Sequence, residues 1–197
     1  MNSKDVRELP SYRFSHHALT WWGTMGVIAI EGTVFALAVM AYYYLRSHSN
    51  TWPMSMKPPE LLWGTLNTVV LVASGVPNHL AKKAAEAHDI HGVRLWLGVS
   101  LLFGLAFIVV RCFEFAALNC RWDSNAYGSI VWVLLGLHTT HLVTDVYDSA
   151  VLYGLFFTDK LDGKRFVDVS ENAVYWYFVL AAWLPIYFTI YFGARAV

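Results

Sequence analysis

The strongest constraint on this chain is a succession of five long apolar stretches separated by shorter polar segments. A helix needs about 20 apolar residues to cross the hydrocarbon core of a bilayer. The stretches occupy most of the 197 residues, so little sequence remains for a separate soluble domain. We therefore predict an all-α polytopic membrane protein that forms a single membrane domain over residues 1–197. The predicted transmembrane helices are residues 21–45, 61–80, 93–118, 127–157 and 172–193.

The composition agrees with a membrane protein. Hydrophobic residues make up 57% of the chain and charged residues 14%, whereas soluble domains have about 45–50% and about 25%. Basic and acidic residues both number 14, which gives no basis for a nucleic-acid partner. Cys112 and Cys120 lack CxxC spacing, so they predict neither a metal cluster nor a disulfide scaffold. The polar segment 1–20 precedes a full-length apolar stretch, so we expect no cleavable signal peptide.

Basic residues are distributed unevenly around the predicted spans. If the spans alternate in direction, nine Lys and Arg residues lie on the side of the N-terminus and four on the other side. Cytoplasmic segments of membrane proteins carry an excess of these residues. We therefore expect residues 1–20 in the cytoplasm and the C-terminus outside. The nine are Lys4, Arg7, Arg13, Lys82, Lys83, Arg94, Lys160, Lys164 and Arg165, and the four are Arg46, Lys57, Arg121 and Arg195.

Ionisable residues inside the apolar spans are the first candidates for function, because a charge at the bilayer centre costs about 2.5–3.5 kcal/mol on insertion scales. Glu31 lies near the middle of the first span and is either a proton-linked or lipid-linked carboxyl, or a protonated acid bonded to a neighbouring helix. Arg111 and Glu114 are three residues apart and can pair, which favours a structural ion pair near the interface. Asn67 is expected to form an interhelical hydrogen bond.

The fourth span carries two histidines and two aspartates at spacings of three, four and three, which puts them on one helical stripe. A metal site or a proton relay is one interpretation, and a polar seam between helices is the other. One straight helix cannot bring four ligands to one metal, and a b-type haem usually needs histidines on two facing helices, so we expect a structural seam without metal or haem. The four residues are His138, His141, Asp145 and Asp148.

Six motifs follow one another along the chain, and their order resembles subunit III of the haem–copper oxygen reductases, cytochrome c oxidase subunit III. The likeness covers residues 22–192. The motifs are WWGTMGVIAIEGTVF with Glu31, the pair Trp52-Pro53, LNTVVLVASG, RCFEF with Glu114, YGSIVWVLLGLHTTH with His138 and His141, and YWYFVLAAWLPIYFTIYF in the last span.

The sequence departs from the family pattern at several polar positions. Tyr177 and Leu180 stand where the last helix of the family has a histidine and an aspartate, and Ile30 replaces a small polar residue. Arg111 replaces a glutamine, and Asp145 replaces a glycine. The polar cluster of the last helix is therefore expected to have moved to the fourth span, with Asp145 as a partner of the histidines. The chain resembles a divergent member of the five-helix bacterial type.

The resemblance implies an accessory, non-catalytic subunit of a proton-pumping terminal oxidase in the bacterial cytoplasmic membrane. It would pack on subunit I in a complex with subunit II, hold phospholipid in a cleft and support proton uptake. The resemblance places Glu31 at the cleft and makes Glu114, His138 and His141 cross-helix contacts. No redox centre is expected in this chain, and haem and copper would lie in the partner subunits.

Two alternatives stay open at this point. The altered last helix also suits a subunit III-like component of another respiratory complex or supercomplex, such as a nitric oxide reductase or an alternative quinol–cytochrome c reductase. The histidine–aspartate stripe also suits a stand-alone metal-binding or transport protein.

Overall fold

The computed structural model describes residues 13–14, 16, 18–158 and 162–195, and every regular element in them is helical. The all-α prediction is confirmed. Most of the predicted N-terminal segment 1–20 lies outside the described residues, as do Lys4, Arg7 and Lys160. The helices are α1 (Leu19–Ser47), α2 (Leu61–Glu86), α3 (Ile90–Ala116), α4 (Ala126–Leu155) and α5 (Gly163–Tyr187), and a π-helical turn, η2 (Phe188–Phe192), continues α5.

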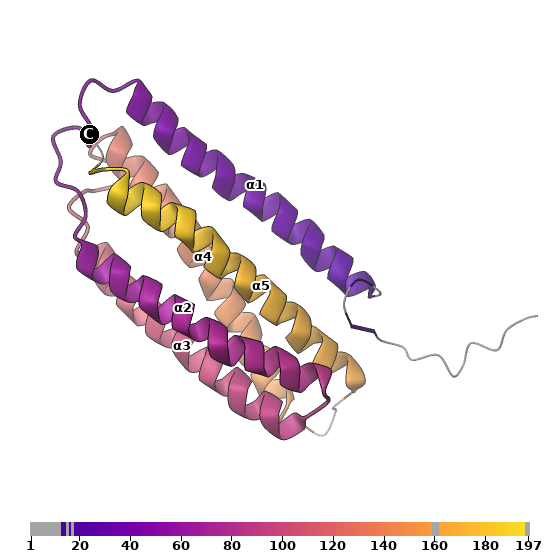
Figure 1. The fold of residues 1–197 in the computed structure, drawn as a ribbon. Coiled ribbons are helices and arrows are strands. Elements are labelled where there is room, and N and C mark those ends of the chain that lie inside the picture. Colours follow the sequence, from indigo (N-terminus) through magenta and orange to yellow (C-terminus); the bar gives the residue numbers. More distant parts are fainter. Residues whose placement is uncertain (1–12, 15, 17, 159–161, 196–197) are drawn as a thin grey trace, which may run out of the picture.

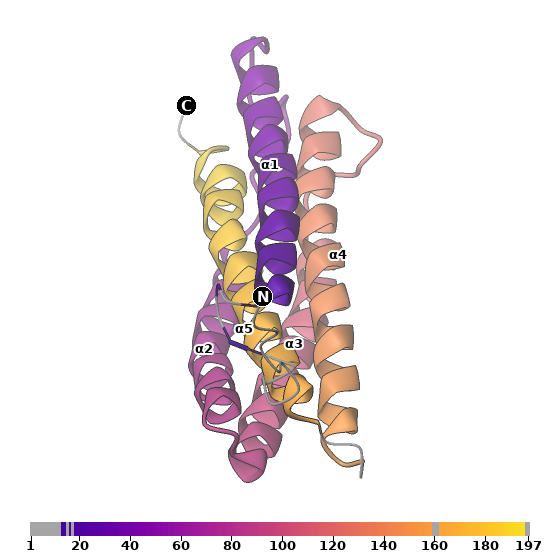
Figure 2. The same ribbon diagram turned by 90° about the vertical axis from the view of Figure 1, so that its right-hand side faces the viewer.

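Successive helices run in opposite directions and form one elongated bundle (Figure 1). The α2 and α3 helices lie side by side as a hairpin, and α5 packs against both α2 and α4. Among the described helices, α1 packs substantially against α4 and α5 only. Figure 2 shows α1 next to α4 and in front of α5. The α1 helix is therefore a peripheral element, and the other four helices form the main body of the bundle.

Two helix boundaries differ clearly from the sequence prediction. The last helix begins at Gly163, nine residues before the predicted start at 172, and α2 continues to Glu86 rather than ending at 80. Both extensions are amphipathic. Phe166 and Val167 are buried while Lys164 is exposed, and Ala81 and Ala85 are buried in the α2 extension. The sequence prediction placed these segments in loops because they contain charged residues. In the structure, one face of each turn is packed against the bundle.

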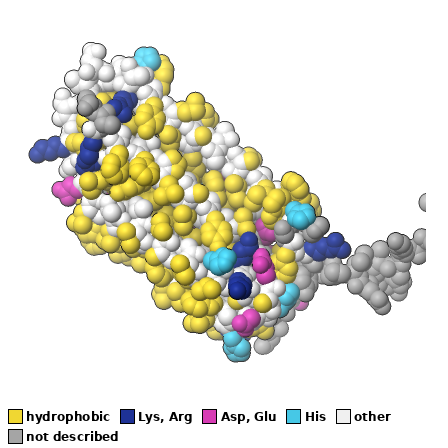
Figure 3. All heavy atoms as spheres, in the orientation of Figure 1, with side chains coloured by type: hydrophobic (Ala, Val, Ile, Leu, Met, Phe, Trp, Pro, Cys, Tyr) yellow, Lys and Arg dark blue, Asp and Glu magenta, His cyan; other side chains and the backbone are white. Residues whose placement is uncertain are grey.

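Four helical segments are long and apolar enough to cross a membrane, namely α1, α3, α4 and the combined segment Gly163–Phe192. The α2 helix is the exception, because it carries polar residues such as Asn67, Ser74 and Asn78 along its length. The predicted span at residues 61–80, and with it the count of five spans, is therefore not confirmed by length and hydropathy. Figure 3 shows hydrophobic side chains over the middle of the visible face and charged side chains gathered towards its two ends.

Buried tryptophans bind neighbouring helices through their ring nitrogens. Trp176 Nε1 donates to Ser74 Oγ at 2.9 Å, and Trp183 Nε1 donates to Thr68 Oγ1 at 2.8 Å, so both link α5 to α2. In lipid there is little hydrophobic driving force between helices, and close packing and interhelical hydrogen bonds hold them together. Gly64 in α2 contributes close packing, because a Cβ at this position would overlap the Tyr191 ring.

Candidate functional site

Two groups of polar side chains join the helices around buried or partly buried carboxylates. The first, the central cluster, consists of Asn67, Arg111, Glu114, His138 and Tyr191. Arg111 Nη1 and Glu114 Oε2 form an ion pair at 3.1 Å. Asn67 Nδ2 and the Tyr191 hydroxyl donate to the two oxygens of the same carboxylate. The Glu114 carboxylate thus connects α2, α3 and η2 at a single point.

Arg111 extends the central cluster to α4. Its Nη2 lies 3.4 Å from His138 Nδ1, and His138 Nε2 lies 3.1 Å from the carbonyl oxygen of Val179. A carbonyl oxygen only accepts, so Nε2 carries the hydrogen and Nδ1 accepts from Arg111. The Arg111 guanidinium also lies over the rings of Trp183 at 4.2 Å and Phe107 at 4.8 Å.

The Arg111–Glu114 pair lies in the last two turns of α3 and is enclosed by neighbouring helices. Both side chains are 1% exposed. The sequence placed this pair near the membrane interface from its position along the span, but that position does not reveal how many helices surround the pair. Removing two charges from water is costly, and further hydrogen bonds are needed to offset the cost. We therefore interpret the central cluster as a structural contact between the helices of the bundle.

The second group, the outer cluster, consists of Glu31 on α1, His141 on α4 and Tyr175 on α5. The Tyr175 hydroxyl donates to Glu31 Oε2 at 2.6 Å. His141 Nε2 lies 3.6 Å from Glu31 Oε1. The outer cluster joins α1, the peripheral helix, to the two helices against which it packs.

His141 also bonds within its own helix. Its Nδ1 lies 2.7 Å from the carbonyl oxygen of Leu137 and donates to it. The other ring nitrogen, Nε2, is therefore the one that faces Glu31.

A groove of about 670 Å³ opens beside the outer cluster, between α1, α4 and α5. Glu31 and Tyr175 lie at its inner limit, and an ion pair between Arg165 and Asp168, 3.1 Å apart, lies towards its outer end. From Thr20 to Glu31 the groove follows twelve residues of α1, an advance of about 16 Å along the helix axis. We call it the α1–α4–α5 groove. Its lining consists of Thr20, Gly23, Thr24, Val27, Glu31, Thr144, Asp148, Val151, Leu152, Leu155, Arg165, Asp168, Glu171, Asn172 and Tyr175.

The structure divides the predicted histidine–aspartate stripe. His138 and Asp145 are buried, whereas His141 is partly exposed and Asp148 is exposed and lines the groove. At about 100° per residue, His141 and Asp148 point about 60–80° away from His138, which turns them towards α1. Within the described residues, neither oxygen of Asp145 has a hydrogen-bond partner. Asp145 is therefore not bonded to the histidines, contrary to the expectation from the sequence.

The described residues contain no group of three or more His, Cys, Asp or Glu side chains arranged to hold a metal ion. His138 and His141 have their ring nitrogens directed at protein atoms. The two clusters join helices, and the outer cluster presents Glu31 and Tyr175 to the α1–α4–α5 groove.

The comparisons with known proteins decide the family. The family model described as cytochrome c oxidase subunit III matches residues 49–195. The chain belongs to this family. The chain is 28% identical over 179 residues to a probable cytochrome c oxidase subunit 3 of Nocardia farcinica, with 86% of each chain covered. It is 23% identical over 177 residues to cytochrome c oxidase subunit 3 of Thermostichus vulcanus, with 88% of this chain and 87% of the relative covered.

The resemblance read from the motifs is thus confirmed, and the chain is a subunit of a haem–copper oxidase. A third relative, cytochrome c oxidase subunit 3 of Synechocystis, is 24% identical over 190 residues, with 92% of this chain and 80% of the relative covered. The relatives match along most of their own length, so the likeness concerns the whole helical bundle and not a single motif.

Sequence reasoning missed the polar groups that this subunit III has in its last helix. The last span was expected to have lost its polar contacts. However, the hydroxyls of Tyr175 and Tyr191 donate to the carboxylates of Glu31 and Glu114, respectively. The Tyr177 hydroxyl lies 3.1 Å from His79 Nδ1. Tyrosine has an apolar body and a polar tip, so a hydropathy reading counts it as lipid-facing. The many aromatic residues of this span were the available signal that hydroxyl groups could replace the missing histidine and aspartate.

Proposed function

We propose that the chain is the accessory subunit III of a bacterial terminal oxidase, packed on subunit I in a complex that also contains subunit II. It would carry no redox centre, and the haem and copper would lie in the partner subunits. Family membership supports the assembly with other oxidase subunits. The proposed role of this chain is to hold lipid and to sustain proton uptake by its neighbour.

The proposed topology has five transmembrane helices, with α2 as the fifth. The helix is 26 residues long, or about 39 Å at 1.5 Å per residue. Its low hydropathy comes from residues that face the bundle, since Asn67, Ser74 and Asn78 are at most 3% exposed. Its exposed face carries Leu62 and Val76. A helix that is apolar towards lipid and polar towards its neighbours suits a membrane span.

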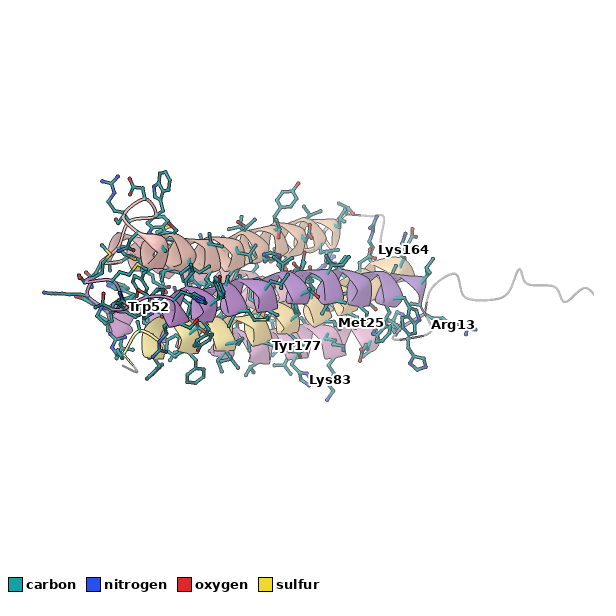
Figure 4. The ribbon with its side chains drawn as sticks, turned by 90° about the horizontal axis from the view of Figure 1, so that it is seen from above. Arg13, Met25, Trp52, Lys83, Lys164 and Tyr177 are labelled. Atoms are coloured by element: carbon teal, nitrogen blue, oxygen red, sulfur yellow. The ribbon has the colours of Figure 1, made fainter. Side chains whose placement is uncertain are left out.

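The proposed orientation places the start of α1 in the cytoplasm and the end of α5 outside. Six of the nine basic residues predicted for the cytoplasmic side are described, and Figure 4 labels Arg13, Lys83 and Lys164 towards the end of the bundle opposite Trp52. The positive-inside rule supports this orientation. A reporter fused to the C-terminus that proves to be cytoplasmic would contradict it.

We assign the α1–α4–α5 groove to a bound phospholipid. Its length of about 16 Å is about half of the roughly 30 Å hydrocarbon core, which suits one acyl chain. Val27 and Leu155 contribute apolar wall, and a phosphate at the outer end would contact Arg165, which also pairs with Asp168 at 3.1 Å. The observation that carries the proposal is that this groove ends at Glu31, the carboxyl that accepts a hydrogen bond from Tyr175 and faces His141.

The test replaces Glu31 in the complete oxidase. We expect Glu31→Ala to leave assembly and the initial turnover rate unchanged, but to reduce several-fold the number of turnovers before half of the activity is lost. The reason is that the polar end of the groove and the contacts of Glu31 with Tyr175 and His141 are removed together. Thr33→Val is the matched control, because Thr33 is exposed on the same helix and, among the described residues, its hydroxyl bonds only to the Ala29 carbonyl.

Phosphorus analysis of the same preparations reports the lipid directly. We expect fewer phospholipids per complex with Glu31→Ala than with Thr33→Val. If the two variants retain the same lipid and survive the same number of turnovers, the assignment of Glu31 and the groove is wrong. Family membership would stand in that case, because it rests on the sequence match.

A further inference from the structure

A second groove, of about 540 Å³, lies between the first half of α3 and the second half of α4. We call it the α3–α4 groove. It shares no lining residue with the α1–α4–α5 groove. Its lining includes His91, Arg94, Leu95, Gly98, Leu102 and Tyr153. The groove therefore has a basic end at the start of α3 and an apolar remainder.

Arg94 is held at the basic end by a neutral group. Its Nε and Nη2 both donate to the carbonyl oxygen of Phe156, at 2.9 and 2.6 Å, and the guanidinium lies 4.8 Å from the centre of the Phe157 ring. A carbonyl orients the guanidinium without neutralising it. Within the described residues, Nη1 of Arg94 has no hydrogen-bond partner and no carboxylate forms an ion pair with Arg94. The basic end thus keeps its positive charge.

The surroundings of Arg94 add to the attraction for an anion. The exposed His91 also lines the groove, and both residues lie in the first turns of α3, where the helix dipole favours negative charge. The nearest acid along the chain, Asp89, accepts from the backbone N–H of His91 at 3.1 Å and caps the helix. Asp89 is thereby engaged with the backbone.

The apolar part of the groove fits a hydrocarbon chain. Leu95 and Leu102 are 58% and 65% exposed. Gly98 leaves room between them, because a Cβ there would lie 3.0 Å from the Tyr153 ring. From Arg94 to Leu102 the helix advances about 12 Å. A partner helix that crosses the membrane is about 30 Å long, so the groove is too short to cover one along its length.

We propose that the α3–α4 groove binds one anionic phospholipid, with its phosphate at Nη1 of Arg94 and one acyl chain along Leu95, Gly98 and Leu102. Basic pockets between transmembrane helices are suited to anionic head groups. The uncompensated charge of Arg94 favours a lipid with net negative charge over a zwitterionic one. The site is independent of the lipid proposed for the α1–α4–α5 groove.

The test measures lipid binding to the delipidated full-length chain in mild detergent. Native mass spectrometry would compare phosphatidylglycerol with phosphatidylcholine of the same acyl chains. We expect at least five-fold tighter binding of phosphatidylglycerol. Arg94→Gln should reduce this preference to less than two-fold. Lys83→Gln is the control, because it removes an exposed positive charge from the same end of the bundle and should keep the preference.

A second variant separates the groove from general charge attraction and does not disturb the contacts of Arg94. Leu102→Trp places a large ring in the apolar part and should weaken the binding of phosphatidylglycerol at least five-fold. Equal binding of both lipids to the unaltered chain would overturn the proposal. Unweakened binding of phosphatidylglycerol to Leu102→Trp would overturn it too. If that variant also failed to assemble with the other oxidase subunits, the groove would hold a protein instead of a lipid.

Discussion

Glu114→Gln offers the sharpest test of the central cluster. The substitution keeps the size of the side chain and removes the charge that faces Arg111 at 3.1 Å. Two unit charges at that distance interact by about 5 kcal/mol at an effective dielectric constant of about 20. Breaking one partner of a buried pair typically costs about 3–5 kcal/mol, because the remaining charge is left without compensation. We therefore expect a loss of about 3–5 kcal/mol in the free energy of unfolding.

The assay is reversible unfolding of the purified chain in mixed micelles, followed by helical circular dichroism as the denaturing detergent fraction rises. The double variant Arg111→Met/Glu114→Gln removes both charges and should recover most of the loss, since replacing a buried pair by apolar groups is often neutral. A loss below about 1 kcal/mol for Glu114→Gln, the range of an exposed pair, would refute the argument. Equal losses for the single and double variants would refute it too.

Three further predictions concern single positions. Gly64→Ala should destabilise the bundle by about 1–3 kcal/mol through overpacking, because the added methyl group meets the Tyr191 ring, and the same unfolding assay reports it. Asp145→Leu should leave stability unchanged or higher, because its buried oxygens have no partner within the described residues; a clear loss would contradict this. Burial raises the pKa of Cys120, in the loop after α3, to about 11 from 9.0. Alkylation of Cys120 should therefore stay slow at pH 8 in the folded chain. Burial of the neutral thiol contributes fully to the free energy of unfolding below pH 9, and this contribution should be lost as the pH rises towards 11.

The sequence by itself determined the class of protein. Apolar stretches long enough to cross a bilayer require helices, because every backbone polar group in lipid must be bonded within its own segment. The six motifs identified the family without any coordinates, and the positions of Glu31, Glu114 and the fourth-span residues followed from the same reading.

Helix ends were less predictable because amphipathic turns do not raise average hydropathy. The first turns of α5 carry Lys164 and Arg165 yet bury Phe166 and Val167. Similarly, the average hydropathy of α2 is too low to identify it as a membrane span, although its polar residues Asn67 and Ser74 are buried inside the bundle. Which face of a helix is covered depends on its neighbours, and that information is not contained in a local average.

Only the tertiary structure decided how the polar residues are grouped. His138 and His141 lie three positions apart on one helix, but the first faces Arg111 and the second faces Glu31. Tyr175 and Tyr191 complete the two clusters from the last helix, at 144 and 77 residues from their carboxylate partners. Periodicity places residues on a face within one helix, whereas a hydrogen bond between helices requires their relative rotation and register. Those are set by packing across the whole bundle, which is why the groove beside Glu31 and its contacts with Tyr175 and His141 are evident only in three dimensions.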